Sequence, residues 1–178
     1  RRQSVGRIVM RRICFVVNDA PFFLSHRLPI ALGAQAAGYD VHVATPDSPR
    51  RSEIERYGLA FHPIPLSRSS ATPSTEVGSI YALIRLYREL RPVLVHHVTH
   101  KPVLYGSVAA RWACVPAVVN AVSGLGYVFI SPGWRAAIRR RAVITGYRLA
   151  FGHPNCRGIF QNADDAAVFL RSRATRPE

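Results

Sequence analysis

The sequence is poor in acidic residues and in cysteine, and it holds one lysine and one methionine. Cys14, Cys114 and Cys156 are odd in number and widely spaced, and no CxxC pair occurs. This pattern argues against a disulfide framework or a zinc ribbon and fits a reducing cytoplasm. Cys14 lies in an apolar run, where a thiol behaves as a small buried hydrophobe.

Long apolar runs are also missing: none reaches the length of about 18 residues that a membrane-spanning helix needs. The basic start, RRQSVGRIVMRR, is not followed by the apolar core of a signal peptide. Because Met10 directly precedes RRICFVVND, we expect residues 1–9 to be an upstream or disordered extension. Apolar residues make up 48% of the 178, so residues 10–178 can form one domain with a real core.

Basic residues dominate the charge, giving a formal net charge of +14 that is almost entirely arginine. Such a charge favours an anionic partner: nucleic acid, acidic lipid headgroups or a phosphorylated substrate. Since the sequence carries no aromatic platform and no recognition motif, we expect no nucleic-acid partner. One segment concentrates the charge, in Arg135, Arg139, Arg140, Arg141 and Arg148.

Apolar and polar segments alternate in a way that predicts an α/β protein. Short apolar or alternating runs predict strands at residues 12–17, 40–45, 59–65, 93–98, 116–122 and 157–162. Helical patterns predict helices from about residue 25 to 38, at 51–58, 76–90, 102–113 and 134–151, and from 163. This alternation indicates a Rossmann-like, doubly wound parallel sheet of about six strands.

Ligands of such sheets bind beyond the carboxyl ends of the strands, where the strand order reverses. In a Rossmann-like order that crevice lies between the first strand and the strand VLVHHV. Asn18 and Asp19 follow the first strand, and the stretch from His97 to Lys101 ends the other. We therefore expect these two segments to face the ligand.

Three histidines and the lysine fall together in the stretch HHVTHK. We expect no metal there, because His96 and His97 alternate to opposite faces and no acidic or thiol ligand is near. His96 is expected to pack under a helix. The start of a helix after a strand favours anionic groups. The candidate rim of the substrate cleft is therefore His97, Thr99, His100 and Lys101.

The segment from Asn18 to Arg27 is expected to be a loop after the first strand. Helix amides near Ser25 would hold a phosphate, with Arg27 adding charge. In the alternative, Phe22 and Phe23 pack the loop while His26 and Arg27 are solvated. The candidate substrate-binding residues here are Asn18, Asp19, Phe22, His26 and Arg27.

A glycine-rich segment follows the fifth predicted strand. Gly124 and Gly126 let the backbone approach a ligand closely, so Ser123, Gly124 and Gly126 are further candidate substrate-binding residues. A flexible turn would explain the same glycines.

Four stretches resemble a known family: VVNDAPFFLSHRLPIALGAQAAGYDVHVATP, VHHVTHKPVLYGSVAAR, VVNAVSGLGYVF and IFQNADD. In order and spacing they are similar to the amino-terminal domain of family 4 glycosyltransferases. The most similar subgroup extends undecaprenyl-diphosphate-linked sugars for capsule, O-antigen or glycan assembly. The resemblance implies the GT-B arrangement, in which the amino-terminal domain binds the acceptor and touches the membrane. A carboxy-terminal domain then holds most of the nucleotide-sugar site, including a Glu-x7-Glu element.

The resemblance therefore implies the acceptor half of a retaining enzyme. It would transfer a sugar from a nucleotide-sugar to a lipid-linked saccharide, without a cofactor or metal. The chain lacks the family's second domain, the usual Gly-Gly of the first loop and the histidine after the fifth strand, where it reads NAVSG. We therefore assign no catalytic residue and expect activity to need a carboxy-terminal domain, which a separate gene can encode. The alternative is a non-catalytic remnant that binds a membrane or a partner.

The arginine-rich helix expected at residues 134–151 is the candidate membrane contact, through Trp134, Arg135, Arg139, Arg140, Arg141 and Arg148. A lipid-linked acceptor would place it on anionic lipid at the inner face of the cytoplasmic membrane. Arg140 interrupts its apolar stripe, so a solvated helix beside the core is the alternative.

Overall fold

The computed structural model describes residues 10–66, 72–122, 134–171 and 175. They form a six-stranded parallel sheet with the order β3-β2-β1-β4-β5-β6. The strands are β1 (Arg12–Val17), β2 (Asp40–Thr45), β3 (Ala60–Pro63), β4 (Leu94–Val98), β5 (Val118–Val122) and β6 (Cys156–Phe160). The order reverses between β1 and β4, so the expected Rossmann-like, doubly wound sheet is confirmed.

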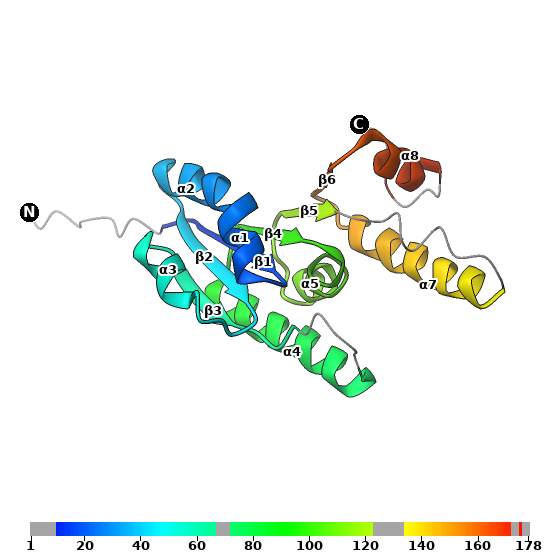
Figure 1. Ribbon diagram of the computed structural model, residues 1–178, viewed down its shortest axis with the longest axis horizontal. Coiled ribbons are helices and arrows are strands. Elements are labelled where there is room, and N and C mark those ends of the chain that lie inside the picture. The colour runs from blue at the N-terminus through cyan, green and yellow to red at the C-terminus, as the bar shows by residue number, and fades with distance from the viewer. Residues whose placement is uncertain (1–9, 67–71, 123–133, 172–174, 176–178) are drawn as a thin grey trace, which may run out of the picture.

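The described helices cover both faces of this sheet (Figure 1). They are α1 (Ala20–His26), α2 (Leu28–Ala36), α3 (Arg51–Arg56), α4 (Pro73–Leu90), α5 (His100–Trp112), α7 (Trp134–Phe151) and α8 (Ala163–Arg171). Helices α1, α2 and α3 pack on one face, and α4, α5 and α7 pack on the other. None of the helices in the described ranges combines the length and apolarity needed to cross a bilayer.

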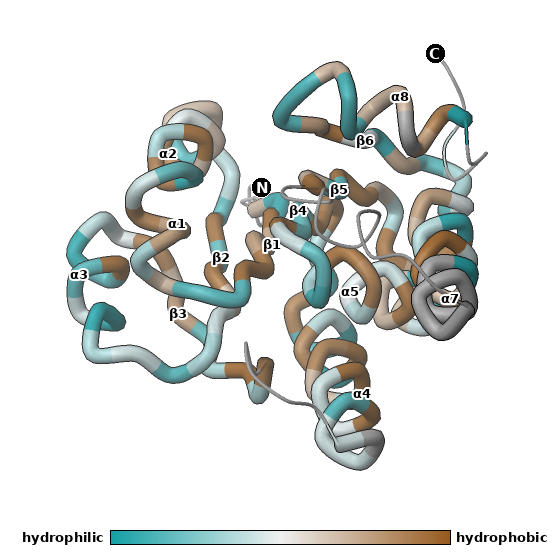
Figure 2. Tube along the Cα trace, turned by 45° about the vertical axis from the view of Figure 1, so that its right-hand side comes forward, coloured by the Kyte–Doolittle hydropathy of each residue, from teal (hydrophilic) through white to brown (hydrophobic). Residues whose placement is uncertain are grey.

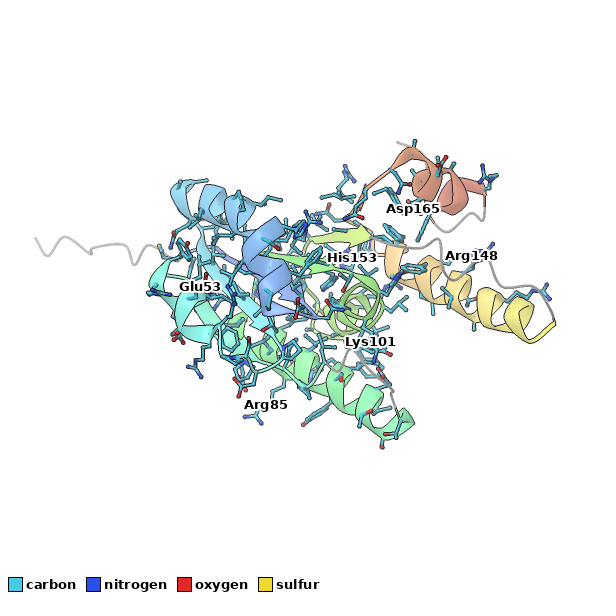
Figure 3. All side chains as sticks on the ribbon, viewed as in Figure 1. Glu53, Arg85, Lys101, Arg148, His153 and Asp165 are labelled. Carbon is cyan, nitrogen blue, oxygen red and sulfur yellow. The ribbon has the colours of Figure 1, made fainter. Side chains whose placement is uncertain are left out.

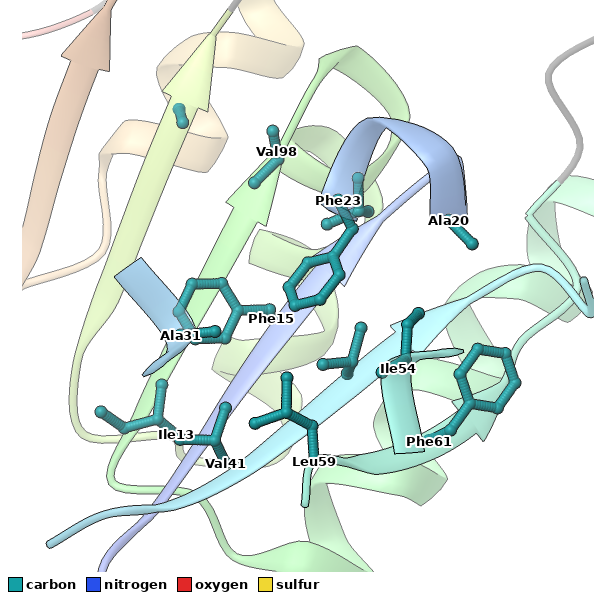
Figure 4. Close-up of a cluster of buried hydrophobic side chains, with 13 residues drawn as sticks. Ile13, Phe15, Ala20, Phe23, Ala31, Val41, Ile54, Leu59, Phe61 and Val98 are labelled. Atoms are coloured by element: carbon teal, nitrogen blue, oxygen red, sulfur yellow. The ribbon is translucent and has the colours of Figure 1, made fainter. Parts of the chain in front are cut away.

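The core under α1–α3 is aliphatic and aromatic (Figure 4). Phe15 of β1 meets Phe23 of α1 edge-to-face, with ring centroids 6.0 Å apart. Ala31 of α2 and Ile54 of α3 are fully buried against the same strands.

The core under α4, α5 and α7 combines apolar packing with a buried polar network. Figure 2 shows hydrophobic segments in β1 and β5 and in the helices around them. At the centre, His97 of β4 is fully buried, and its Nε2 lies 2.9 Å from the Tyr87 hydroxyl of α4. Its Nδ1 lies 2.8 Å from Asn120 Oδ1 of β5.

Asn120 extends this network to the neighbouring helices. Its Nδ2 donates to Ser107 Oγ of α5 at 3.1 Å and to the carbonyl of Ala150 in α7 at 3.4 Å. Buried polar groups are costly unless they are hydrogen-bonded, so this network favours one arrangement of the helices over the strands.

One expectation about local structure is wrong. Residues 18–27 are not a loop, because α1 occupies Ala20–His26 and a second helix begins at Leu28. The Asp19 carboxylate accepts the Phe22 amide at 3.1 Å, which is a standard helix cap. Pro29 lies in the first turn of α2, where its missing N–H is tolerated, so the two helices stay separate.

Gly106 of α5 provides the first test, because a Cβ there would overlap the His97 ring. We expect Gly106→Ala to lower the free energy of unfolding by about 1–3 kcal/mol through overpacking. Gly33→Ala is the control, since a Cβ at Gly33 of α2 meets nothing within 4 Å. Urea unfolding of both variants measures the difference, and equal stability of the two would contradict the assigned role of His97.

Candidate functional site

The strand ends of β1 and β4 form the site that the topology singles out. Val17 of β1 pairs with Val98 of β4, so the segments that follow both strands leave the sheet side by side. Asp19 caps α1 after β1, and Thr99 is the N-cap of α5 after β4. Arg27 joins α1 to α2 on the same side of the sheet.

Residues of the segments around these strand ends carry unpartnered polar atoms. Four buried side-chain atoms lack a hydrogen-bond partner among the described residues, and three of them are Arg27 Nε, His96 Nε2 and Thr99 Oγ1. The fourth, His42 Nε2, lies 3.1 Å from the carboxylate of Asp40, which begins β2 at the opposite, amino-terminal ends of the strands. Buried polar groups are normally satisfied, so these three unsatisfied atoms are candidates for contact with a polar ligand.

Arg27 and His96 are close enough to influence each other's charge. Burial, followed by the positive charge of Arg27, lowers the pKa of His96 to about 3. Burial also lowers the pKa of the Arg27 guanidinium, which nevertheless stays a cation at neutral pH. The His96 ring stacks on the ring of Phe15, its neighbour on β1, with the ring centroids 5.0 Å apart.

Thr99 adopts an uncommon backbone conformation, with φ 74° and ψ 173°. A β-branched residue in this region is strained, and such strain clusters at functional sites. The Thr99 side chain makes no capping hydrogen bond to α5. Its hydroxyl is buried and has no partner among the described residues. As the N-cap, Thr99 stands at the start of α5, where an anionic group is favoured.

His97 does not lie at the cleft rim, so its assignment as a substrate-binding residue is wrong. It is 0% exposed, and both ring nitrogens contact Tyr87 and Asn120. Burial lowers the pKa of His97 to about 4, so the ring is neutral at pH 7. Its role is to hold β4 against α4 and β5.

Lys101 points from α5 to α4, where its ammonium lies 2.9 Å from Glu76 Oε1 (Figure 3). Glu76 also accepts a hydrogen bond from Tyr105, and this bond, together with the larger effect of burial, raises the pKa of the Tyr105 hydroxyl. An anionic ligand at Lys101 must therefore compete with Glu76. The sequence did not indicate this pairing, because the two residues are far apart along the chain.

His100 is tied to α7. Its Nδ1 contacts the hydroxyl of Tyr147, which is buried in the cluster around Phe169. Burial raises the pKa of Tyr147, so its hydroxyl stays protonated and can donate to His100. The contact couples the start of α5 to the arginine-rich helix.

The structure also places the candidate residues in and before α1. The rings of Phe22 and His26 stack 4.3 Å apart on α1, and His26 Nδ1 lies 2.7 Å from Ser25 Oγ. Asn18 is half-buried directly after β1. The expected phosphate site at the Ser25 amides is wrong: Ser25 lies in the last turn of α1, and its hydroxyl donates to Pro21 O at 2.9 Å.

Two sets of candidates lie wholly or partly outside the described residues. Ser123, Gly124 and Gly126 belong to residues 123–133, which lie outside. Helix α7 has the expected bounds, but the side chains of Trp134, Arg135, Arg139 and Arg140 are not described. Arg141 and Arg148 of the same helix are exposed.

An apolar pocket of about 620 Å³ lies beyond the carboxyl ends of β2 and β3. Pro46 and Asp47 follow β2, Ile64 and Leu66 follow β3, and Thr75 comes from the first turn of α4. Glu76, the partner of Lys101, is the next residue along α4. The apolar pocket and the polar residues that follow β1 and β4 are therefore both at the carboxyl ends of the strands. A ligand with an apolar part and an anionic part would suit this combination.

The chemistry of the site is that of binding. With its pKa lowered to about 3, His96 is a poor general base at neutral pH. Arg27 offers a charged donor, Thr99 a hydroxyl and His96 a neutral ring nitrogen, which together suit phosphate or sugar oxygens. Across the described part of the chain, no group of three His, Cys, Asp or Glu side chains could hold a metal ion.

Sequence reasoning missed the unpartnered nitrogen of His96. Strand alternation correctly separates His96 from His97, yet nothing local in the sequence shows that Arg27 lies close enough to lower the pKa of His96. That proximity depends on the turn between α1 and α2.

The fold defines a Rossmann-like α/β domain with a polar cluster at its switch point. Residues 12–149 match the family model described as "Glycosyl transferase 4-like". This chain belongs to the glycosyl transferase 4-like family. The chain is 26% identical over 161 residues to the N,N'-diacetylbacillosaminyl-diphospho-undecaprenol alpha-1,3-N-acetylgalactosaminyltransferase of Campylobacter jejuni. That match covers 90% of this chain and 42% of the relative.

Solved structures show the same fold. A glycosyltransferase from Rickettsia africae has a TM-score of 0.65 at 11% identity, covering 93% of this chain and 40% of that one. Sucrose-phosphate synthase from Thermosynechococcus elongatus has a TM-score of 0.64 at 14% identity, covering 94% and 46%. The chain thus spans less than half the length of these relatives. The resemblance to family 4 glycosyltransferases is confirmed.

The two buried histidines predict how stability depends on pH. In the unfolded chain they take up protons at about pH 6.5, whereas in the folded protein the pKa values are about 3 for His96 and about 4 for His97. Below about pH 6.5 protons bind only the unfolded chain. As the pH is lowered from about 6.5 to about 4, the free energy of unfolding should therefore fall by about 1.4 kcal/mol per pH unit for each histidine. Urea unfolding from pH 7 to 4.5 measures this slope, and His96→Gln should remove one histidine's share. An unchanged slope in that variant would contradict the buried, neutral state of His96.

Proposed function

We propose that this chain is the acceptor-binding half of a retaining glycosyltransferase. The complete enzyme moves a sugar from a nucleotide-sugar to a lipid-linked saccharide in cell-surface polysaccharide or glycan biosynthesis. A carboxy-terminal domain, in a longer chain or separately encoded, supplies the donor site. Family membership supports the glycosyltransferase role, and the named reaction of the Campylobacter jejuni relative supports a diphosphate-linked polyprenol acceptor.

One observation supports the proposed site: the unpartnered atoms of Arg27, His96 and Thr99 at the strand-order reversal. Arg27 binds a phosphate of the acceptor, and the Thr99 hydroxyl and the first amides of α5 bind its other oxygens. His96 supplies a neutral hydrogen bond. The apolar pocket beside α4 takes the adjoining apolar part of the lipid.

The proposed acceptor is anchored in a bilayer, so the chain works at the inner face of the cytoplasmic membrane. Helix α7 contains five arginines and a tryptophan in a sequence with no acidic residue, and Arg141 and Arg148 are exposed. Positive charge on a helix surface binds anionic lipid headgroups. We assign α7 to this contact, through Trp134, Arg135, Arg139, Arg140, Arg141 and Arg148.

Arg27→Gln tests the proposed acceptor site. A charged hydrogen bond contributes about 1.5–3 kcal/mol, so the variant should bind a short-chain isoprenyl diphosphate saccharide about 10–100-fold more weakly. Arg56→Gln is the matched control and should bind normally, because Arg56 ends α3 at the amino-terminal ends of the strands, away from the proposed site. Isothermal titration calorimetry in detergent measures both. Equal affinities of Arg27→Gln and Arg56→Gln would overturn the assignment.

A further inference from the structure

Every exposed residue of helix α2 is apolar. Figure 1 shows α2 on the outside of the molecule, on the opposite face of the sheet from α4. The exposed residues are spaced by three, four or seven positions, so they share one side of the helix. We call this side the α2 face: Pro29, Ile30, Gly33, Ala36 and the C-cap Ala37. A helix that is apolar all round is normally buried, so the α2 face is unusual as a surface for water alone.

The one strongly polar side chain of α2 is used elsewhere. Gln35 Nε2 donates to the carbonyls of Tyr57 and Gly58 at the end of α3, at 3.3 Å each. It therefore ties α2 to the neighbouring turn and does not solvate the outer side. On the inner side, Ala31 is fully buried in the core cluster that contains Phe15.

Gly33 lies in the middle of the α2 face, where the fold of the single chain gives no reason for a glycine. A glycine inside a helix is less stable than an alanine. The backbone of Gly33 is helical, and a Cβ built there meets nothing within 4 Å. Close approach of another backbone is a physical reason for glycine at such a position.

Ile30 projects next to this glycine. Its side chain is 45% exposed, and it precedes Gly33 by three residues, which places the two side by side. Gly33 and Ala37 are spaced by four and form a shallow row beside Ile30. The α2 face therefore holds one large apolar side chain and, directly beside it, a gap.

A surface that holds both a projecting side chain and a gap is complementary to itself. In a dimer with two-fold symmetry, each residue of one copy meets its contact residue in the other copy, and the reverse also holds. Ile30 of each copy then fills the gap over Gly33 of the other. Two helices can cross closely in this way, because the glycine removes the side chain that would hold them apart.

Charge also favours a second copy at the α2 face. Two chains with a net charge of +14 repel each other, so their association costs least where few charges are brought together. Among the helices that the structure describes, α1 and α2 are the two without Asp, Glu, Lys or Arg. Helix α3, which lies on the same side of the sheet, carries charged residues at both ends.

We propose that the α2 face is a homodimer interface, in which the α2 helices of two copies cross at Gly33 and each Ile30 packs over Gly33 of the other copy. A stable interface buries about 1,200–2,000 Å² in total, which is more than one helix from each copy supplies. Dimerisation should therefore be weak and depend on concentration. The inference goes beyond the proposed glycosyltransferase role, which concerns the carboxyl ends of the strands.

Sedimentation velocity from micromolar to near-millimolar concentrations tests the dimer. Ile30→Gln removes the projecting side chain, and Gly33→Gln fills the gap, without adding a charge in either case. Each variant should weaken dimerisation about 100-fold, because a two-fold dimer loses the same contact twice.

Two exposed positions on α4 provide matched controls. Val77→Gln replaces a branched apolar side chain, and Gly78→Gln replaces a glycine whose Cβ also meets nothing within 4 Å. Both should dimerise like the unchanged chain. Circular dichroism checks that all four variants are folded, and Gly33→Gln decides if Ile30→Gln is not. A chain that stays monomeric over the whole range would overturn the proposal, and so would α2 variants that dimerise as well as the α4 controls.

Salt and ligand binding separate this inference from the proposed enzyme role. Added salt should strengthen the dimer, because it screens the repulsion between two basic chains, whereas it weakens contacts of basic residues with phosphate. A dimer that dissociates on adding salt would contradict an uncharged interface. Gly33→Gln should keep its affinity for the short-chain isoprenyl diphosphate saccharide, so the dimer and the acceptor site are tested independently.

Discussion

Adjacent residues of a β-strand cannot point to the same face, and this constraint divides the roles of His96 and His97. His97 enters the layer of α4, α5 and α7, where Tyr87 and Asn120 satisfy both of its nitrogens. His96 enters the opposite layer, where it stacks on Phe15 and keeps Nε2 without a partner among the described residues. One ring thus fixes the strand, and the other is left for a ligand beside Arg27.

The fixed ring positions the rest of the site. The His97 network joins β4 to α4, β5 and, through Asn120, to α5 and α7, and so it fixes β4 against these elements. Thr99 occupies the junction between β4 and α5 in a strained conformation, and His100 follows it with a contact to Tyr147 of α7. Helix α7, which carries the proposed membrane contact, is therefore also one of the helices that hold the site in place.

The sequence predicted the sheet well, because period-two apolar runs and the turns between them are local signals. Strand alternation also separated His96 from His97 correctly. It failed at residues 18–27, where the Asp19 cap and Pro21 start an extra helix, and at His97, whose partners come from distant α4 and β5. Lys101 shows the same limit, since Glu76 is 25 residues away and only the fold brings the two charges together. Motif resemblance identified the family, whereas the open nitrogen of His96 emerged only from the packing.

The central claim is that Arg27, His96 and Thr99 bind the diphosphate of a lipid-linked acceptor. A crystal structure with a short-chain isoprenyl diphosphate saccharide tests it most directly. The account predicts phosphate oxygens within hydrogen-bonding distance of Arg27 Nε and Thr99 Oγ1, with His96 Nε2 engaged by the same ligand. A diphosphate held on α7, with those three atoms still unpartnered, would contradict it.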